Sequence, residues 1–363
     1  MLELLSKLVT MESPTREKLA VDRLGKFIVG ELQNLGINVT LDHQQNFGDH
    51  VLAHLRSNDS EPGFLTLCHI DTVFPLGTII KQPCIGREDR MHGPGALDMK
   101  AGTVILLTCV RRMLTEGRFP ESGLTMLFTT DEETGSHSSR PLIERLARRA
   151  SLVLCMEPGM PDGSLKTWRK GVGSFEIIVR GKAAHAGSDH EKGCNAIEEL
   201  AHHIVAIRKL TDYQKKTTLS VGVIEGGTVT NVIPDFARAK IDIRVMDSTE
   251  GERVTKYIRG LTPVIDGCTI EVRGGLNRPP MPYDQCMAET FQKAQVIAAQ
   301  AGIQLRAGGS GGGSDANFVA TLGVPVLDGL GAIGNGMHSP DEYILVDSLP
   351  ERAALLYSLL LNW

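Results

Sequence analysis

The feature that most constrains the fold is an alternation, along the first half of the chain, between short apolar runs and segments with helical periodicity. Residues 15–35 carry apolar side chains at helical spacing, namely Leu19, Val21, Leu24, Ile28 and Leu32. Further helices are expected at 99–114 and 138–149, and strands at 64–68, 122–130 and 152–156. Because these strands are apolar almost throughout, both faces of a largely parallel sheet must be covered by helices.

The pattern changes between residues 171 and 279. Over 237–245 polar and apolar side chains alternate strictly, as in a strand with one buried face. The expected order of elements is β-α-β-β-α-β, which is the ferredoxin-like unit. We therefore predict an α/β catalytic domain formed by 1–170 and 280–363, interrupted by an inserted α+β domain at 171–279.

Composition excludes several classes of partner. The formal net charge is −5 and the basic residues are scattered, so nucleic acid is not expected as a partner. No apolar run approaches the length of a membrane span, and the N-terminal residues do not form a signal-peptide pattern. Seven cysteines without a CxxC pair indicate reduced thiols. We expect a cytoplasmic protein.

Residues that ligate metals gather where the predicted strands end. His69 and Asp71 follow one strand, Glu132 and Glu133 follow the next, and others lie after a third strand, in the Gly-rich loop 93–100 and in a late loop, namely Glu157, Asp98 and His338. Any single acidic residue at such a place is more often a helix cap or turn former. Several together, combining imidazole with carboxylate, suit zinc, manganese or cobalt. In open α/β sheets ligands bind at this edge.

Six motifs, in order along nearly the whole chain, resemble those of the co-catalytic zinc metallopeptidases, a family that includes aminoacylase, acetylornithine deacetylase, succinyl-diaminopimelate desuccinylase and the glutamate carboxypeptidases. The motifs are His-x-Asp-Thr-Val at 69–73, Gly-Pro-Gly-x-x-Asp-x-Lys at 93–100, Asp-Glu-Glu-x-Gly-Ser at 131–136, Met-Glu-Pro at 156–158, Gly-Lys-Ala-Ala-His-Ala-Gly at 181–187 and His-Ser-Pro-Asp-Glu at 338–342. Any one of them alone would be weak evidence.

The resemblance implies a role for each matching residue. Asp98 would bridge two metal ions, with zinc expected and cobalt or manganese as alternatives. One ion would be completed by His69 and Glu157, and the other by Glu133 and His338. The general base would be Glu132, whose side chain should diverge from that of Glu133 if the backbone is extended. Asp71 would hydrogen-bond the far nitrogen of His69.

In the inserted domain, the resemblance implies that His185 reaches the site of a partner subunit and stabilises the oxyanion, which requires a homodimer. Without the resemblance, His185 is more simply a solvated or capping residue. Asn231, Arg244 and Arg278 would hold substrate carboxylates. For Arg244 an ion pair with Asp242 on the same strand face is an equal alternative.

Pro94 and Glu157 favour the glutamate carboxypeptidase branch over the deacetylases. The resemblance then implies hydrolysis of a C-terminal amide bond that releases an amino acid, glutamate above all, from an N-acyl or peptidyl substrate. An acetylornithine-type deacylase, a dipeptidase and a catalytically silent metal-binding protein are the alternatives. The Gly-rich segment 308–315 lacks the Gly-Lys-Ser/Thr ending of a phosphate-binding loop and is expected to be a mobile active-site loop.

Overall fold

The computed structural model describes residues 1–58, 60–61 and 63–363. The chain forms two compact units. The first unit contains Met1–Trp168, Tyr283–Ser310 and Ser314–Trp363. The second unit contains Arg169–Pro282 together with Gly311–Gly313.

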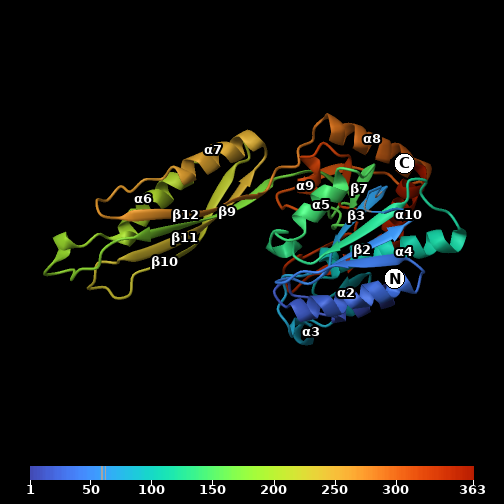
Figure 1. Ribbon diagram of the computed structural model, residues 1–363, viewed down its shortest axis with the longest axis horizontal. Coiled ribbons are helices and arrows are strands. Elements are labelled where there is room, and N and C mark those ends of the chain that lie inside the picture. Colours follow the sequence, from blue (N-terminus) through green and yellow to red (C-terminus); the bar gives the residue numbers. More distant parts are fainter. Residues whose placement is uncertain (59, 62) are drawn as a thin grey trace. The chain divides into compact units, whose positions relative to one another are not determined.

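An eight-stranded mixed sheet forms the centre of the first unit, in the order β1-β2-β6-β3-β7-β14-β8-β13 (Figure 1). Its strands are β1 (Asn38–Asp42), β2 (His50–Leu55), β3 (Phe64–His69), β6 (Leu124–Thr129), β7 (Leu152–Cys155), β8 (Leu165–Arg169), β13 (Ala307–Ser310) and β14 (Val326–Asp328). The four central strands β6, β3, β7 and β14 run parallel. The flanking strands β1, β2 and β8 pair antiparallel. The predicted fold class, a largely parallel sheet between helices, is confirmed.

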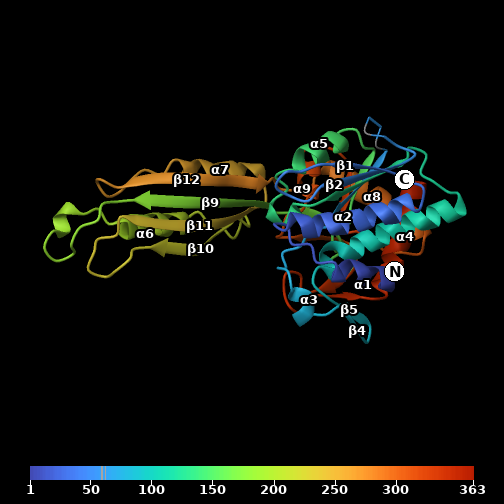
Figure 2. The ribbon, with the colours of Figure 1, turned by 60° about the horizontal axis from the view of Figure 1, so that its bottom comes forward.

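Helices cover the sheet on both faces, with α2 and α4 on one side and α5 and α9 on the other (Figure 2). The helices of this unit are α1 (Leu2–Thr10), α2 (Lys18–Gln33), α3 (Thr78–Lys81), α4 (Ala101–Glu116), α5 (Arg140–Ala147), α8 (Gln285–Gln300), α9 (Ala316–Ala320) and α10 (Ser348–Asn362). A small sheet in the order β15-β16-β5-β4 joins Gly334–Asn335, Tyr343–Leu345, Arg90–His92 and Ile85–Arg87.

One side chain expected on the buried face of α2 is not there. Val21, Leu24, Ile28 and Leu32 are buried, whereas Leu19 is 79% exposed. Leu19 precedes Val21 by two positions, which in a helix turns the side chain to nearly the opposite face. The apolar stripe therefore begins at Val21.

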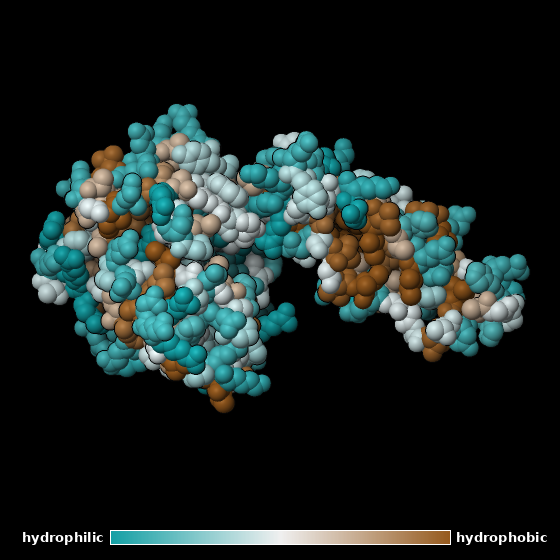
Figure 3. Space-filling view, turned by 180° about the vertical axis from the view of Figure 1, so that it is seen from behind, coloured by the Kyte–Doolittle hydropathy of each residue, from teal (hydrophilic) through white to brown (hydrophobic). Residues whose placement is uncertain are grey.

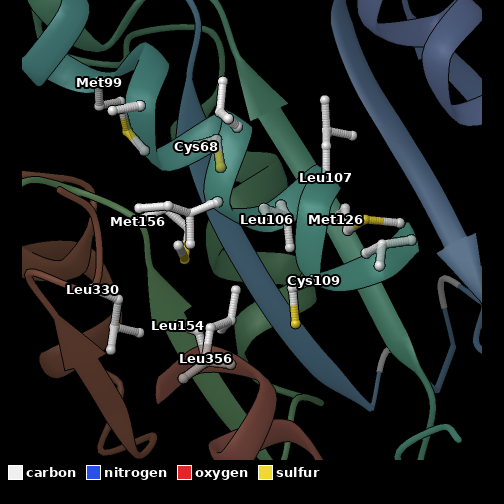
Figure 4. Close-up of a cluster of buried hydrophobic side chains, with 14 of the residues drawn as sticks. Cys68, Met99, Leu106, Leu107, Cys109, Met126, Leu154, Met156, Leu330 and Leu356 are labelled. Carbon is white, nitrogen blue, oxygen red and sulfur yellow. The ribbon is translucent and has the colours of Figure 1, made fainter. Parts of the chain in front are cut away.

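A cluster of buried apolar side chains packs around β3 and α4. Figure 4 shows sulfur-containing and aliphatic side chains from several elements meeting there. Cys68 and Cys109 are part of this cluster, and burial raises the pKa of each thiol to about 12. All seven cysteines lie in the described part of the chain as free thiols, and four of them, Cys68, Cys109, Cys155 and Cys268, are buried.

The second unit is a four-stranded antiparallel sheet in the order β10-β11-β9-β12, with two helices packed on one face. Its elements follow the predicted order β-α-β-β-α-β: β9 (Gly171–Arg180), α6 (Ala196–Arg208), β10 (Thr218–Gly226), β11 (Phe236–Val245), α7 (Ser248–Arg259) and β12 (Thr269–Arg278). The side chains of Asn195 and Asp247 accept backbone N–H groups in the first turns of α6 and α7. These caps explain where both helices begin.

The Gly-rich segment is not one loop, so that prediction is wrong. Its first residues belong to the edge strand β13, and α9 begins at Ala316. Gly309 packs directly against the Trp168 ring, since a Cβ at this position would lie 1.9 Å from Trp168 Cε2. The glycine is therefore required by close packing. No helix within the described ranges is long and apolar enough to cross a bilayer.

Candidate metal centre

Five residues that the sequence singled out lie near one another at one edge of the main sheet. His69 is the last residue of β3, and Glu157 follows β7. Glu133 lies in the 3₁₀ turn Glu132–Thr134 that follows β6. Because β3, β6 and β7 are parallel neighbours, their carboxyl ends meet at the same edge. Asp98 comes from the turn Ala96–Lys100 before α4, and His338 from the loop between β15 and β16.

The Asp98 carboxylate stands between the two histidines. Its Oδ1 lies 3.0 Å from His69 Nε2, and its Oδ2 lies 3.0 Å from His338 Nε2. Each histidine also faces a second carboxylate: Glu157 Oε1 is 3.5 Å from His69 Nε2, and Glu133 Oε2 is 3.3 Å from His338 Nε2. The five side chains thus form two donor sets that share Asp98.

These separations fit bound cations. Donor atoms at zinc-ligand distances in a tetrahedron lie roughly 3.3 Å apart, which is close to the spacings around both histidines. One ligand atom each from His69, Asp98 and Glu133 falls within 4.8 Å of the others. Among the described residues, Glu133 Oε1 is buried and has no hydrogen-bond partner. A buried carboxylate oxygen without a partner is costly unless a cation or donor neutralises it.

The pKa values of the residues in the centre also indicate that negative charge is concentrated there. Burial, together with the charge of Asp98, raises the pKa of Glu133 to about 7. Hydrogen bonds to Asp98 and Glu133 raise the pKa of His338 to about 11. Three carboxylates with little exposure therefore face two imidazoles, and a divalent ion is the usual partner for such a set of oxygen and nitrogen donors.

Asp71 connects His69 to the turn that carries Glu132 and Glu133. His69 Nδ1 lies 3.0 Å from the Asp71 backbone oxygen and 3.5 Å from its carboxylate, so the backbone carbonyl is the nearer acceptor. The carboxylate accepts the backbone N–H groups of Glu132 and Glu133 at 3.3 and 3.2 Å, and the hydroxyl of Thr15 at 2.7 Å. Asp71 therefore orients both the imidazole and the acidic turn.

Glu132 and Glu133 are not in an extended segment, so the assumption made from the sequence is wrong. They begin a 3₁₀ turn capped by Gly135, whose φ is 104°. Neighbouring side chains on a 3₁₀ turn diverge by about 120° because the turn has three residues. The expected divergence of the two carboxylates is kept, by a different backbone geometry.

Two further charged side chains belong to the centre but were missed from the sequence. Glu342 is 1% exposed, and its carboxylate accepts the backbone N–H groups of Gly95, Leu97 and Asp98 at 2.7–3.0 Å. Lys166 on β8 is 4% exposed and lies 3.8 Å from Glu157. Glu342 ends the His338 motif, and Lys166 is a charged residue in a buried strand. Both signals were present in the sequence.

The remaining predicted residues lie in the second unit. His185 is exposed, and its Nδ1 accepts the backbone N–H groups of Gly187 and Ser188, which leaves Nε2 to carry the proton of a neutral ring. Asn231 lies beside it, since the Asn231 carbonyl accepts the backbone N–H of Ala186. Arg278, at the end of β12, is 4% exposed.

Arg244 makes the ion pair that was left open as an alternative. Its Nε and Nη2 each donate to a carboxylate oxygen of Asp242 at 2.9 Å. Nη1 donates to the carbonyl of Gly311 at 3.1 Å. Residues two positions apart on a strand share a face, which explains the pairing.

Residues 65–362 match the sequence profile of Peptidase family M20/M25/M40. Carboxypeptidase G2 of Pseudomonas sp. (strain RS-16) is 30% identical, across 99% of this chain and 88% of its own. Succinyl-diaminopimelate desuccinylase of Paracoccus denitrificans is 28% identical, across 74% and 73%. In fold, the chain is similar to the YxeP protein of Bacillus subtilis, a dinuclear metal-binding peptidase from the M20 family, with a TM-score of 0.66, 17% identity and coverage of 99% and 96%. The chain that carries these donor sets therefore belongs to peptidase family M20/M25/M40, a family of metal-dependent hydrolases.

Proposed function

We propose that this protein is a dinuclear metallocarboxypeptidase that releases a C-terminal amino acid, glutamate above all, from N-acyl or peptidyl substrates. The observation that carries the proposal is the position of Asp98 between two histidines, each of which has a second carboxylate beside it. In this assignment Asp98 would contribute to holding both ions, His69 and Glu157 would complete the site of one, and Glu133 and His338 would complete the site of the other. Zinc is the expected metal, with cobalt or manganese as alternatives.

When bound, the two ions lower the pKa of a water molecule and polarise the scissile carbonyl. The residues of the chain supply the proton transfers. Glu132 stands next to the ligand Glu133, on a turn held by Asp71, and would take the water's proton and pass it to the leaving amine. His185 of one subunit would donate its Nε2–H to the oxyanion that develops in the site of the partner subunit.

Recognition of glutamate is assigned to the second unit. Arg278 is a buried guanidinium, and Asn231 lies next to the His185 segment. A planar guanidinium suits a carboxylate because it can donate two parallel hydrogen bonds. The similarity to carboxypeptidase G2 over nearly the whole chain supports this choice of branch. Arg244 is a weaker candidate, since Asp242 already occupies its guanidinium.

A homodimer is part of the proposal. Apolar side chains gather on one face of the second unit (Figure 3). The exposed apolar residues of this unit include Val205 on α6 and Val223 and Ile224 on the edge strand β10. An exposed apolar edge strand is a surface that a partner chain commonly covers.

Metal analysis combined with an activity screen tests the proposal. Bound metal is removed from the purified protein with a chelator, zinc, cobalt or manganese is added back, and hydrolysis of N-acyl glutamates, N-acyl ornithines, N-succinyl diamino acids and dipeptides is compared. We expect two metal ions per subunit and the highest kcat/KM on an N-acyl glutamate. Hydrolysis confined to an N-succinyl diamino acid would instead favour a desuccinylase, which is the activity named for the relative from Paracoccus denitrificans.

A further inference from the structure

A pocket of about 390 Å³ opens beside Glu133 within the first unit. It is lined by the N-terminal segment Pro14–Glu17 and by Thr72, Val73, Pro75 and Leu76, which follow the His69 motif. The two segments lie side by side, since Pro14 and Thr72 form a parallel β-bridge. Glu133, a residue of the candidate metal centre, and its neighbour Thr134 also line the pocket. The mechanism proposed above assigns no role to this pocket.

The walls of the pocket are joined to the metal centre by hydrogen bonds. Thr15 donates its hydroxyl to the Asp71 carboxylate at 2.7 Å and its backbone N–H to the Thr72 carbonyl at 3.3 Å. Thr72 in turn donates its backbone N–H to the Ser13 carbonyl at 2.9 Å. The pocket is therefore held at a fixed place relative to the residues that orient His69 and Glu133.

Most of the surface that lines the pocket is apolar. Pro14, Val73, Pro75 and Leu76 supply an apolar surface, and Val73 and Leu76 are 43% and 51% exposed. Side chains of this kind gain free energy when a ligand covers them. The charged residues at the rim, Arg16 and Glu17, are adjacent, exposed and opposite in sign. The pocket therefore supplies no net positive charge to offset the burial of a carboxylate.

We propose that this pocket is the subsite for the acyl group of the substrate, and that it selects an uncharged apolar acyl group over an acidic one. The inference rests on the proposed function, because it needs the scissile carbonyl at the metal centre. The released amino acid is assigned to Arg278 and Asn231 of the second unit, so the acyl group is the part of the substrate left for the first unit. An apolar cavity of about 150 Å³ already holds a benzene ring, so a branched aliphatic chain fits this volume.

An isosteric pair of substrates tests the selection. N-succinyl-glutamate and N-(4-methylpentanoyl)-glutamate have acyl chains of the same shape, one ending in a carboxylate and the other in an isopropyl group. We expect kcat/KM to be at least about tenfold higher for 4-methylpentanoyl, since desolvating the charge is not compensated. Equal values, or a preference for succinyl, would overturn the inference while leaving the proposed function intact.

Substitutions at Leu76 locate the preference in the pocket. Leu76→Ser should lower the ratio of the two kcat/KM values by about tenfold, because a side chain that the isopropyl group covers is lost. Leu76→Lys adds a cation and should shift the ratio toward succinyl. Ile80→Ser is the matched control, since Ile80 is 83% exposed on the neighbouring α3 and does not line the pocket. A ratio unchanged in both Leu76 variants would place the selectivity elsewhere.

Binding without turnover separates this inference from the proposed function. If neither glutamate derivative is cleaved by the metal-loaded enzyme, the proposed release of glutamate fails. The pocket is then tested with 4-methylpentanamide and succinamate as free ligands, by saturation-transfer NMR. Stronger binding of 4-methylpentanamide that weakens in Leu76→Ser, but not in Ile80→Ser, would support the subsite. Equal binding to all three proteins would reject it.

Discussion

The Glu342 carboxylate accepts the backbone N–H of Asp98 at 3.0 Å, and so holds in place the residue that stands between the two histidines. The same carboxylate binds Gly95 and Leu97. Glu342 belongs to the segment that also carries His338. One short stretch of chain thus contributes a candidate ligand and supports another.

Replacing Glu342 by Gln should therefore weaken metal binding. The amide keeps one acceptor oxygen but loses the negative charge and part of the set of hydrogen bonds from Gly95, Leu97 and Asp98. Partners of this kind typically alter metal affinity by about 10- to 100-fold. Zinc titration by calorimetry measures the change, with Asp341→Asn, an exposed neighbour, as control. Wild-type affinity in Glu342→Gln would show that the loop is held by other contacts.

Glu132→Gln should keep both metal ions and lose nearly all turnover. General bases contribute about 10²- to 10⁴-fold to rate, so kcat should fall by that factor. The adjacent variant Glu133→Gln is the contrast, because it should lose metal as well as activity. Metal content by mass spectrometry and kcat on one substrate distinguish the two. A Glu132→Gln enzyme with wild-type kcat would assign the base to another residue.

Arg278→Ala should raise KM for N-acyl glutamates far more than for uncharged N-acyl amino amides. The loss of a charge-assisted pair costs about 1.5–3 kcal/mol, which corresponds to a KM increase of about 10- to 150-fold. Arg273→Ala on the same strand is the control, since Arg273 is exposed and pairs with Glu271. Equal losses on charged and uncharged substrates would remove the carboxylate-binding role.

The stability of the second unit should depend on pH through Glu250. Hydrogen bonds from Arg253 and Lys215 lower the pKa of Glu250 to about 2. A lowered pKa in the folded state gives stability that is present above the ordinary value of 4.5 and is lost as the pH falls toward 2.

Glu250→Gln should accordingly lower Tm at pH 7, and the difference from wild type should shrink between pH 4.5 and pH 2. Calorimetric scans across this range measure the effect. Glu252→Gln, an exposed neighbour on α7, serves as control. A Tm difference that does not change with pH would mean that packing, and not charge, is what the substitution disturbs.

The sequence predicted the fold class because hydrophobic periodicity reports burial directly. The strictly alternating run that became β11 and the apolar runs that became β3 and β7 are examples. Short elements could not be found in this way: β15 and β16 have two and three residues, and the pairing of β16 with β5 joins distant segments. A two-residue strand carries no periodicity.

For the candidate site, the motifs predicted which residues take part, and the tertiary fold determines how these residues are arranged. Thr15 shows the limit, because its hydrogen bond to Asp71 joins residues 56 positions apart and leaves no local pattern. The hydrogen bonds that Glu342 accepts come from backbone N–H groups 244 to 247 positions away. Contacts of this kind depend on tertiary packing, so residue type and spacing do not reveal them.

His338 meets Asp98 from 240 positions further along the chain, and the whole second unit is encoded between Glu157 and His338. During translation, a nascent chain that has already folded β3, β6 and β7 therefore presents its carboxylates with one imidazole and not the other. On the ligand assignment proposed here, the second ion can be captured only after the ribosome has released the His338 loop. On this assignment, a chain that ends before His338 keeps one donor set whole and lacks the imidazole of the other.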